Sequence, residues 1–270
     1  MISALLLLVG GIAGGVFGSV LGLGGGILIV PMLTLGFGRP LREAVAVSLV
    51  SVIVTSTAAA GVYLQRHVAN LRLGMVLELF TAIGALVGGL VAFLLDERLL
   101  AGLFAALLVY VAVTMLRRPA ERRVDESAAT EAPASGFVSA LAGPGYTVRN
   151  LPGGIAGSAL AGVVSALLGV GGGIVKVPTM HLVMGVPLRV ATATSNLMIG
   201  ITATAGAVIY LLRGELDAYI AGPVAFGVFV GAVMGSRTAH RIDVRYLRWV
   251  FVLVLAYMAF RMARRAIGWS

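Results

Sequence analysis

Charged residues are scarce in this 270-residue sequence, and cysteine is absent from it. Without cysteine the chain forms no disulfide and no cysteine-ligated metal site, and nothing can be inferred about its redox compartment. Only 11% of the residues are charged, against about a quarter in soluble domains, whereas 59% are hydrophobic. Residues 1–38, 44–65 and 79–95 carry no charge at all. Each run is long enough for a transmembrane helix of ~17–25 residues, so the composition predicts an all-α polytopic membrane protein.

The net charge of +9 comes almost entirely from arginine, because Lys176 is the single lysine among 20 basic residues. Many arginines flank apolar runs, as Arg66, Arg72 and Arg213 do. Membrane proteins place basic residues there, where they fix orientation and contact lipid headgroups. We therefore expect a lipid bilayer, and no nucleic acid, as the partner of this basic chain.

An internal repeat relates the two halves of the chain. The segment Leu21–Ile27, with three consecutive glycines, recurs at Leu168–Ile174, an offset of 147 residues. The same offset, held without a gap, pairs Pro31 with Pro178. Matched glycine and proline positions indicate a duplication, because a shared apolar composition does not by itself reproduce them.

The repeat divides the chain into residues 1–116, a linker of residues 117–149, and residues 150–270. The linker joins a cluster of charges to a run rich in Ala, Ser, Pro and Gly, which is typical of a solvated connection. Each repeat is expected to contain a glycine-broken first segment and three transmembrane helices. The expected broken segments are residues 2–37 and 151–184, and the expected helices are residues 42–65, 73–95, 98–116, 189–212, 218–237 and 245–262.

The first segment of each repeat is too long for one crossing. Residues 2–37 as a continuous helix would extend ~50 Å, beyond the ~30 Å hydrocarbon core. The glycine triplet is expected to break it and to leave residues 27–37 as a half-helix of ~16 Å that reaches mid-membrane. The chain has about 8 crossings if each broken segment crosses once, or about 10, with inverted halves, if each turns back as a hairpin. We favour inverted repeats, since paired broken helices mark the binding sites of many secondary transporters.

The two glycine turns, Gly24, Gly25 and Gly26 in the first repeat and Gly171, Gly172 and Gly173 in the second, are candidates for binding an anion. A glycine-rich turn that leads into a helix exposes unpaired backbone N–H groups at the positive end of the helix dipole. The alternative is that these small residues only let helices approach closely. The occurrence of the turn twice, each time five residues before a proline, favours the binding interpretation.

Two ionisable residues lie within apolar stretches. Lys176 follows Gly173 by three residues, and a charge inside the membrane usually faces a functional cavity. We expect it to face an anionic ligand or a carboxylate, unless its ammonium group reaches the membrane interface. Glu78 is a candidate for proton coupling, and a pairing with the interfacial Arg72 is the alternative explanation.

Hydroxyl and amide side chains follow each broken segment. They suit a desolvated oxyanion, although in membrane helices such groups often bond a carbonyl or hold two helices together. Ser48, Ser195 and Asn196 are the residues that we select as candidates for substrate binding. The full polar series is Ser48, Ser51, Thr55, Ser56, Thr57, Thr192, Thr194, Ser195, Asn196, Thr202 and Thr204.

A metal site is not expected from this sequence. The histidines His67, His181 and His240 lie far apart, and none of them belongs to a metal-ligand spacing. We therefore predict no metal and no other cofactor. No nucleophile, base and orienting group form a recognisable set, so the chain is not predicted to be an enzyme.

The doubled motif resembles that of a known family. The pattern GxGGG-x4-P occurs at Gly22–Pro31 and Gly169–Pro178, and a Pro-x-Arg-x-Ala step follows at Pro40–Ala44 and Pro187–Ala191. These patterns resemble the TauE/SafE family of membrane transporters over nearly the whole chain apart from the linker. The resemblance implies a multi-pass protein of the bacterial inner membrane that exports sulfite, sulfoacetate or related organosulfonates, and it leaves the exact substrate open.

Together these features predict a secondary transporter that binds a small sulfur-containing oxyanion between its two halves. Rocking of one half against the other would alternate access to the site. The membrane potential could drive export, since one charge that moves through 100 mV yields ~2.3 kcal/mol. A passive anion channel is the alternative function. The sequence leaves the oligomeric state, the coupling ion and the orientation of the termini open.

Overall fold

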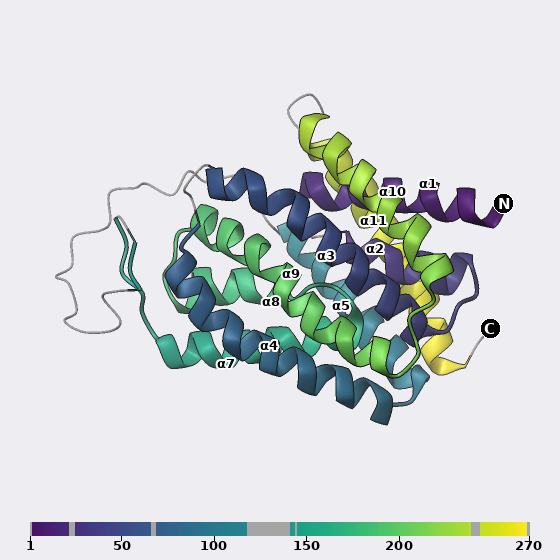
Figure 1. Cartoon of the computed structure of the whole chain (residues 1–270), viewed down its shortest axis with the longest axis horizontal. Coiled ribbons are helices and arrows are strands. Elements are labelled where there is room, and N and C mark those ends of the chain that lie inside the picture. The colour runs from purple at the N-terminus through teal and green to yellow at the C-terminus, as the bar shows by residue number, and fades with distance from the viewer. Residues whose placement is uncertain are drawn as a thin grey trace.

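The computed structural model is a bundle of helices (Figure 1) and describes residues 2–21, 25–65, 69–117, 141–143, 145–238 and 244–268. The first half of the chain forms α1 (Ile2–Leu21), α2 (Gly26–Pro31), the π-helix η1 (Met32–Gly36), α3 (Leu41–Gln65), α4 (Leu71–Leu94) and α5 (Glu97–Arg117). The second half forms α7 (Leu151–Leu168), α8 (Gly173–Pro178), the π-helix η2 (Thr179–Val183), α9 (Leu188–Leu212), α10 (Ala218–Thr238) and α11 (Val244–Ile267).

The all-helical prediction is confirmed for the described residues. The six helices expected after the broken segments lie within two residues of their predicted bounds, except that α11 extends to Ile267. Six described helices, α3, α4, α5, α7, α9 and α10, are long and apolar enough to cross a membrane. The linker, residues 117–149, falls mostly outside the described residues.

Each broken segment continues past its glycines as a short helix that changes pitch at a proline. Pro31 ends α2 and Pro178 ends α8, and in both cases a π-helical turn follows directly. Proline has no backbone N–H, so the hydrogen bond to the carbonyl four residues earlier is lost at that position. The wider π-turn is therefore located where the α-helical ladder is interrupted.

The short helices run back alongside the long helices that precede them. In the second half, Gly172 packs against Ala161 near the end of α7, whereas Met184, just after η2, packs against Gly154 near its beginning. In the first half, Gly25 packs against Gly14 and Met32 against Gly10. The residues that cap the short helices, Gly25 and Gly172, have φ angles of 69° and 71°, which glycine adopts without strain. Each broken segment is thus a helical hairpin.

Helices of one half pack against helices of the other half. α1 runs parallel to α10, with Leu8 beside Gly227 and Ile12 beside Gly231. α4 runs parallel to α7, with Gly84 beside Ala159 and Gly88 beside Val163. Glycine at these contacts lets the backbones approach closely, as small residues do in membrane helix pairs. Thus α10 of the second half packs against the hairpin of the first half, and α4 of the first half packs against the hairpin of the second.

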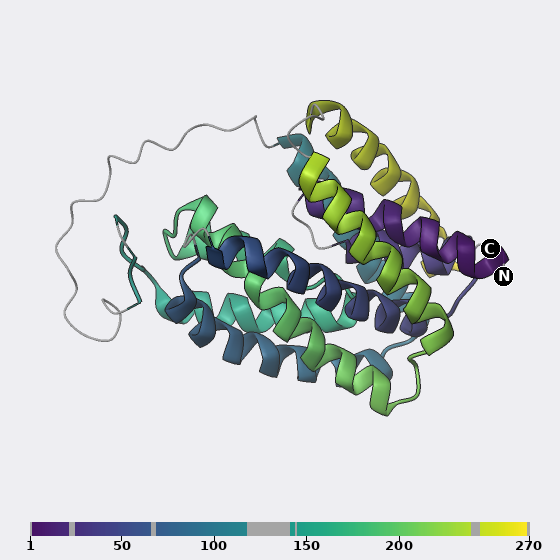
Figure 2. The same cartoon turned by 45° about the horizontal axis from the view of Figure 1, so that its top comes forward.

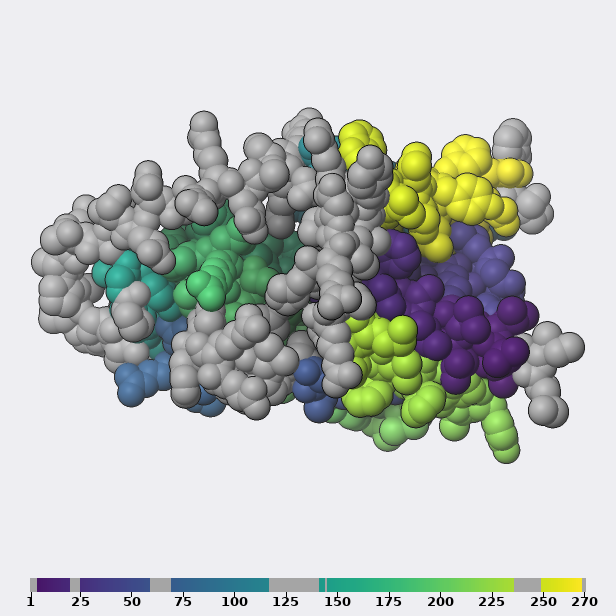
Figure 3. Space-filling model, turned by 90° about the horizontal axis from the view of Figure 1, so that it is seen from above, coloured from purple at the N-terminus to yellow at the C-terminus, as the bar shows by residue number. Residues whose placement is uncertain are grey.

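The central helices α3 and α9 correspond to each other in the repeat but run in opposite directions. Ser56, toward the end of α3, contacts Gly200, whereas Leu49, nearer its beginning, contacts Gly206. Figure 2 shows α1, α10 and α11 together on one side, and α4, α7 and α9 on the other. In the view of Figure 3, α1 residues lie between those of α10 and α11. The rings of Phe17 in α1 and Phe251 in α11 stack with their centroids 6.0 Å apart.

Two apolar clusters fill the described bundle. The larger includes side chains of α2, α3, α5, α10 and α11, with Phe104 and Phe251 fully buried. The smaller lies where α4, η2 and α9 meet, and includes Leu73, Leu77 and Met180. A group of buried polar residues lies between α4, α7, α8 and α9 and carries the chemistry described below.

Candidate substrate and coupling site

The two glycine turns come together in the middle of the bundle. A Cβ atom added to Gly26 would lie 2.5 Å from the carbonyl oxygen of Gly169, which is closer than any real contact allows. The Ser48 hydroxyl of α3 donates to both turns, at 2.6 Å to the Gly169 oxygen and 3.1 Å to the Gly26 oxygen. The proton of Ser48 is therefore engaged by two carbonyls in this state and is not offered to an anion. Gly24 lies outside the described residues.

The second glycine turn lies against α3, α7 and α9. Gly171 contacts Val52 and Ile199, and a Cβ at Gly173 would lie 3.5 Å from the Ser195 hydroxyl. Gly172 lies beside Ser165 of α7. α8 begins at Gly173, and the N–H groups of Val175 and Lys176 donate to the Gly172 carbonyl at 3.2 and 3.0 Å. The N–H groups before them have no carbonyl partner within their own helix.

Buried hydroxyl groups without a hydrogen-bond partner lie on α7 and α9, and two of them, those of Ser165 and Ser195, belong to residues beside this turn. Within the described part of the chain, the hydroxyls of Ser158, Ser165 and Ser195 are fully buried and make no hydrogen bond. Such groups are rare in folded proteins, and each calls for an explanation such as a bound water or ligand. Sequence reasoning selected Ser195 but missed Ser158 and Ser165. Their seven-residue spacing places them on one face of α7, which was the available signal.

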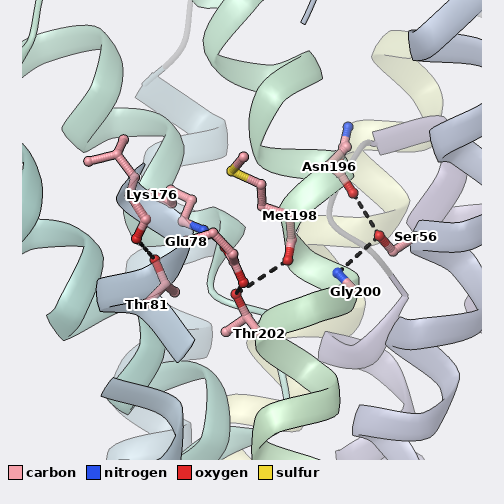
Figure 4. A network of polar contacts seen from close by, with 9 residues as sticks. Ser56, Glu78, Thr81, Lys176, Asn196, Met198, Gly200 and Thr202 are labelled. Carbon is pink, nitrogen blue, oxygen red and sulfur yellow. Dashed lines mark hydrogen bonds and ion pairs between the residues drawn. The ribbon is translucent and has the colours of Figure 1, made fainter. Parts of the chain in front are cut away.

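Lys176 and Glu78 form an ion pair inside the bundle (Figure 4). The ammonium nitrogen of Lys176 lies 2.5 Å from Oε2 of Glu78, and the two side chains are 1% and 5% exposed. Thr202 of α9 donates to the other carboxylate oxygen, Oε1, at 2.6 Å. Of the two partners expected for Lys176, an anionic ligand or a carboxylate, the structure shows the carboxylate. Arg72 is exposed, and Glu78 pairs instead with a residue 98 positions along the chain.

The ion pair has no equivalent on the other side of the repeat. The 147-residue offset places Ile29 at the position of Lys176 and Ala225 at that of Glu78. Thr55 corresponds to Thr202, and its hydroxyl bonds the carbonyl of Val52 in its own helix. Among the residues that the structure describes, the buried charges therefore lie on one side of the duplicated bundle, the side formed by α4, α7, α8 and α9.

Asn196 lies where the Ser56 side chain of α3 contacts the backbone of α9. The Ser56 hydroxyl donates to the Asn196 carbonyl at 2.7 Å and accepts from the N–H of Gly200 at 3.0 Å (Figure 4). The structure thus places the Asn196 backbone carbonyl in a contact between α3 and α9. Other members of the polar series bond backbone carbonyls four residues earlier in their own helices, among them Ser51, Thr57 and Thr204.

No metal-binding cluster accompanies these groups in the described ranges, where no three His, Asp or Glu side chains gather. The chemistry that the arrangement offers is therefore that of one cation, one carboxylate, backbone N–H groups and hydroxyls. These groups can bind an anion and can exchange a proton.

Helices apolar and long enough to cross a membrane, two glycine-broken hairpins and a buried ion pair are features of multi-pass membrane transporters. The sequence profile described as "Sulfite exporter TauE/SafE" matches residues 6–262, and the chain belongs to this family.

Several relatives carry the same description of their class. The chain is 25% identical to the probable membrane transporter protein YunE of Bacillus subtilis, with 94% of each chain covered. It is 26% identical to the probable membrane transporter protein MJ0441 of Methanocaldococcus jannaschii, with 94% of this chain and 92% of the relative covered. It is 29% identical to the probable membrane transporter protein MamO of Paramagnetospirillum magneticum, of which it covers 43%. No solved structure matches the chain.

Proposed function

We propose that the protein is a secondary transporter that exports a small sulfur-containing oxyanion, such as sulfite, sulfoacetate or a similar organosulfonate, across the bacterial inner membrane. The observation that carries the proposal is the position of the buried Lys176 beside a glycine turn flanked by buried hydroxyls without partners. The description of the family supports the sulfur oxyanion as substrate.

The proposed site lies at the beginning of α8. Gly171, Gly172 and Gly173 supply backbone N–H groups, and Ser165 and Ser195 supply hydroxyl donors from α7 and α9. Lys176 supplies a positive charge. A sulfonate or sulfite group presents three oxygens, which need several donors once water is removed. Ser48 holds the two hairpins together in this proposal, and the contact of Asn196 with α3 positions α9.

Inverted repeats provide the structural basis for alternating access. Two observations support the inversion: α3 and α9 correspond in the repeat yet run antiparallel, and both broken segments are hairpins. The close packing of α1 with α10 and of α4 with α7 mixes the two halves. The bodies that rock are therefore proposed to be these mixed bundles rather than residues 1–116 against residues 150–270.

Counterflow in proteoliposomes tests the proposal. Purified protein is reconstituted into vesicles loaded with unlabelled sulfite or sulfoacetate, and uptake of the labelled anion is followed. A transporter should show uptake that saturates and that needs the unlabelled anion inside. Flux that does not saturate and needs no internal anion would show a channel, and a chemically altered anion would show an enzyme.

A matched pair of variants on α9 checks the site itself. Ser195→Ala removes a buried hydroxyl without a partner, whereas Thr204→Ala removes an exposed hydroxyl that bonds the Gly200 carbonyl. The proposed site predicts a raised KM for the first variant and an unchanged KM for the second. An equal KM for both variants would remove Ser195 from the site.

A further inference from the structure

The Lys176–Glu78 pair is the charged centre of the side of the bundle that would hold the substrate. Its two charges cancel, and Thr202 satisfies the second carboxylate oxygen. A buried charge whose partner is removed is strongly destabilising. Lys176 therefore always needs an anionic partner, and in the present state Glu78 fills that role.

Few other ionisable groups can compensate either charge. α7 carries no ionisable side chain. α9 has Arg189 at its start, Arg213 immediately after its end, and Tyr210, whose hydroxyl donates to the Ala166 carbonyl. His181 of η2 lies near the Val186 oxygen, and Arg72 of α4 is exposed. Among the described residues, Lys176 is the cation in contact with Glu78, so a substrate anion at Lys176 would compete with the Glu78 carboxylate for one ammonium group.

If the anion takes Lys176, the Glu78 carboxylate would remain as an unpaired negative charge beside it. Two adjacent anions in a site of low dielectric repel strongly, and a carboxylate in this position is neutralised by a proton. The protonated carboxyl group still has Thr202 as its hydrogen-bond partner. Binding of the anion and protonation of Glu78 therefore favour each other.

We propose, resting on the function proposed above, that Glu78 takes up a proton whenever Lys176 binds the substrate, so that anion and proton cross the membrane together. A proton from water adds to Glu78, the ion pair breaks, and Lys176 pairs with an oxygen of the anion. On the other side the anion leaves, the proton returns to water, and the ion pair forms again. The unloaded and loaded sites have the same net charge for a monovalent anion.

This coupling changes the driving force expected from the sequence. A monovalent anion that moves with a proton transfers no net charge, so the membrane potential does not drive its export. Sulfoacetate carries two negative charges near neutral pH, so with one proton it transfers one net negative charge instead of two. The concentration gradient of the anion and the pH gradient then set the direction. An acidic interior accelerates export and an alkaline interior slows it.

The coupling is tested by measuring proton and anion movement together. Vesicles containing the reconstituted protein and a trapped pH dye are loaded with labelled sulfoacetate, whose acid groups do not titrate near neutral pH, and are diluted into medium without it. Parallel vesicles carry sulfite, and an ionophore holds the membrane potential at zero. We expect the interior to become alkaline as the anion leaves, with roughly one proton per anion.

Glu78→Gln separates coupling from binding. The amide resembles the protonated carboxyl group but cannot release its proton, so Lys176 stays unpaired once the anion has left. The empty transporter therefore cannot readily change back to face the side on which it loads the anion. The ratio of anion exchange to net efflux should rise by about a hundredfold. Thr202→Ala should shift the pH dependence of net efflux, whereas Thr55→Ala, at the corresponding position of the other half, should leave the proton-to-anion ratio unchanged.

The results distinguish the coupling from the transport function. Anion efflux without internal alkalinisation in the wild-type protein would overturn the coupling and leave the transport function standing. Absence of efflux for both anions would overturn both. If Glu78→Gln does not fold, the proton-to-anion ratio of the wild type and the Thr202→Ala pH profile still decide the matter.

Discussion

The hydroxyl of Ser56 in α3 lies between the carbonyl of Asn196 and the N–H of Gly200 in α9, two groups that an uninterrupted helix would join to each other (Figure 4). In an α-helix each N–H bonds the carbonyl four residues earlier, so the Ser56 hydroxyl bonds both members of one such pair. A side chain in this position is a recognised cause of helix bending. The residue of α9 that corresponds to Ser56 is Ala203, which has no hydroxyl, so α9 makes no equivalent contact with α3.

Replacing Ser56 by alanine should remove both hydrogen bonds between its hydroxyl and α9. The net contribution of such hydrogen bonds is small, so we expect a destabilisation of about 1 kcal/mol. Thermal unfolding of the detergent-purified protein measures this change. Thr57→Ala is the control, because the Thr57 hydroxyl is exposed and bonds only its own helix. Equal unfolding temperatures for the two variants would show that the Ser56 bridge adds no stability.

Replacing Gly26 by alanine should disrupt the junction of the two hairpins. The new Cβ would lie 2.5 Å from the Gly169 oxygen and 2.8 Å from a methyl group of Val52, and backbone atoms cannot move aside cheaply. Overpacking of this kind costs about 1–3 kcal/mol or more. Gly36→Ala, in the same hairpin, is the control because no atom lies within 4 Å of its added Cβ. The close contact would be refuted if both variants unfolded at the wild-type temperature.

The helices and their breaks could be predicted from the sequence, because they depend on local features. Apolar run length sets the helices, and glycine followed by proline sets the breaks at Gly25 and Gly172. The same residues predicted that each broken segment either crosses the membrane once or turns back as a hairpin, and the structure shows the hairpin. The pairing of Glu78 with Lys176 could not be predicted, since it joins residues 98 positions apart and depends on the packing of both α4 and α8 against α7 and α9.

Other parts of the site depended on tertiary contacts as well. The Ser48 hydroxyl is a group that can bind an anion, but the contact between the two hairpins places two carbonyl oxygens within hydrogen-bond distance of it. Ser158 and Ser165 correspond to Gly11 and Gly18 in the first half, so a search for matched polar residues passed over them. Ser195 was found because its counterpart, Ser48, is also a serine. The duplicated motif therefore identifies residues that both halves share, but not residues such as Ser158 and Ser165 that occur in one half only.

Removing one partner of the buried ion pair should destabilise the protein far more than removing both. Lys176→Met leaves the Glu78 carboxylate buried without its cation, which costs about 3–5 kcal/mol. The double variant Lys176→Met with Glu78→Gln has no buried charge, and we expect it to regain most of that loss. Thermal unfolding of the wild type, both single variants and the double variant forms a complete cycle. Additive effects of the two substitutions would show that the pair makes no stabilising interaction.

Ser165→Ala should separate stability from ligand binding, because the Ser165 hydroxyl is buried without a partner in the ligand-free protein. Removal of an unpaired buried hydroxyl relieves a desolvation penalty, so the variant should unfold at or slightly above the wild-type temperature. A ligand at 100 times its dissociation constant stabilises by ~2.7 kcal/mol, and loss of one donor to a charged ligand weakens binding by about 1.5–3 kcal/mol. The thermal shift produced by a fixed concentration of sulfite should therefore shrink in Ser165→Ala and stay at the wild-type value in Thr57→Ala. A destabilised ligand-free variant with an unchanged sulfite shift would mean that the Ser165 hydroxyl serves packing in α7 and not the anion.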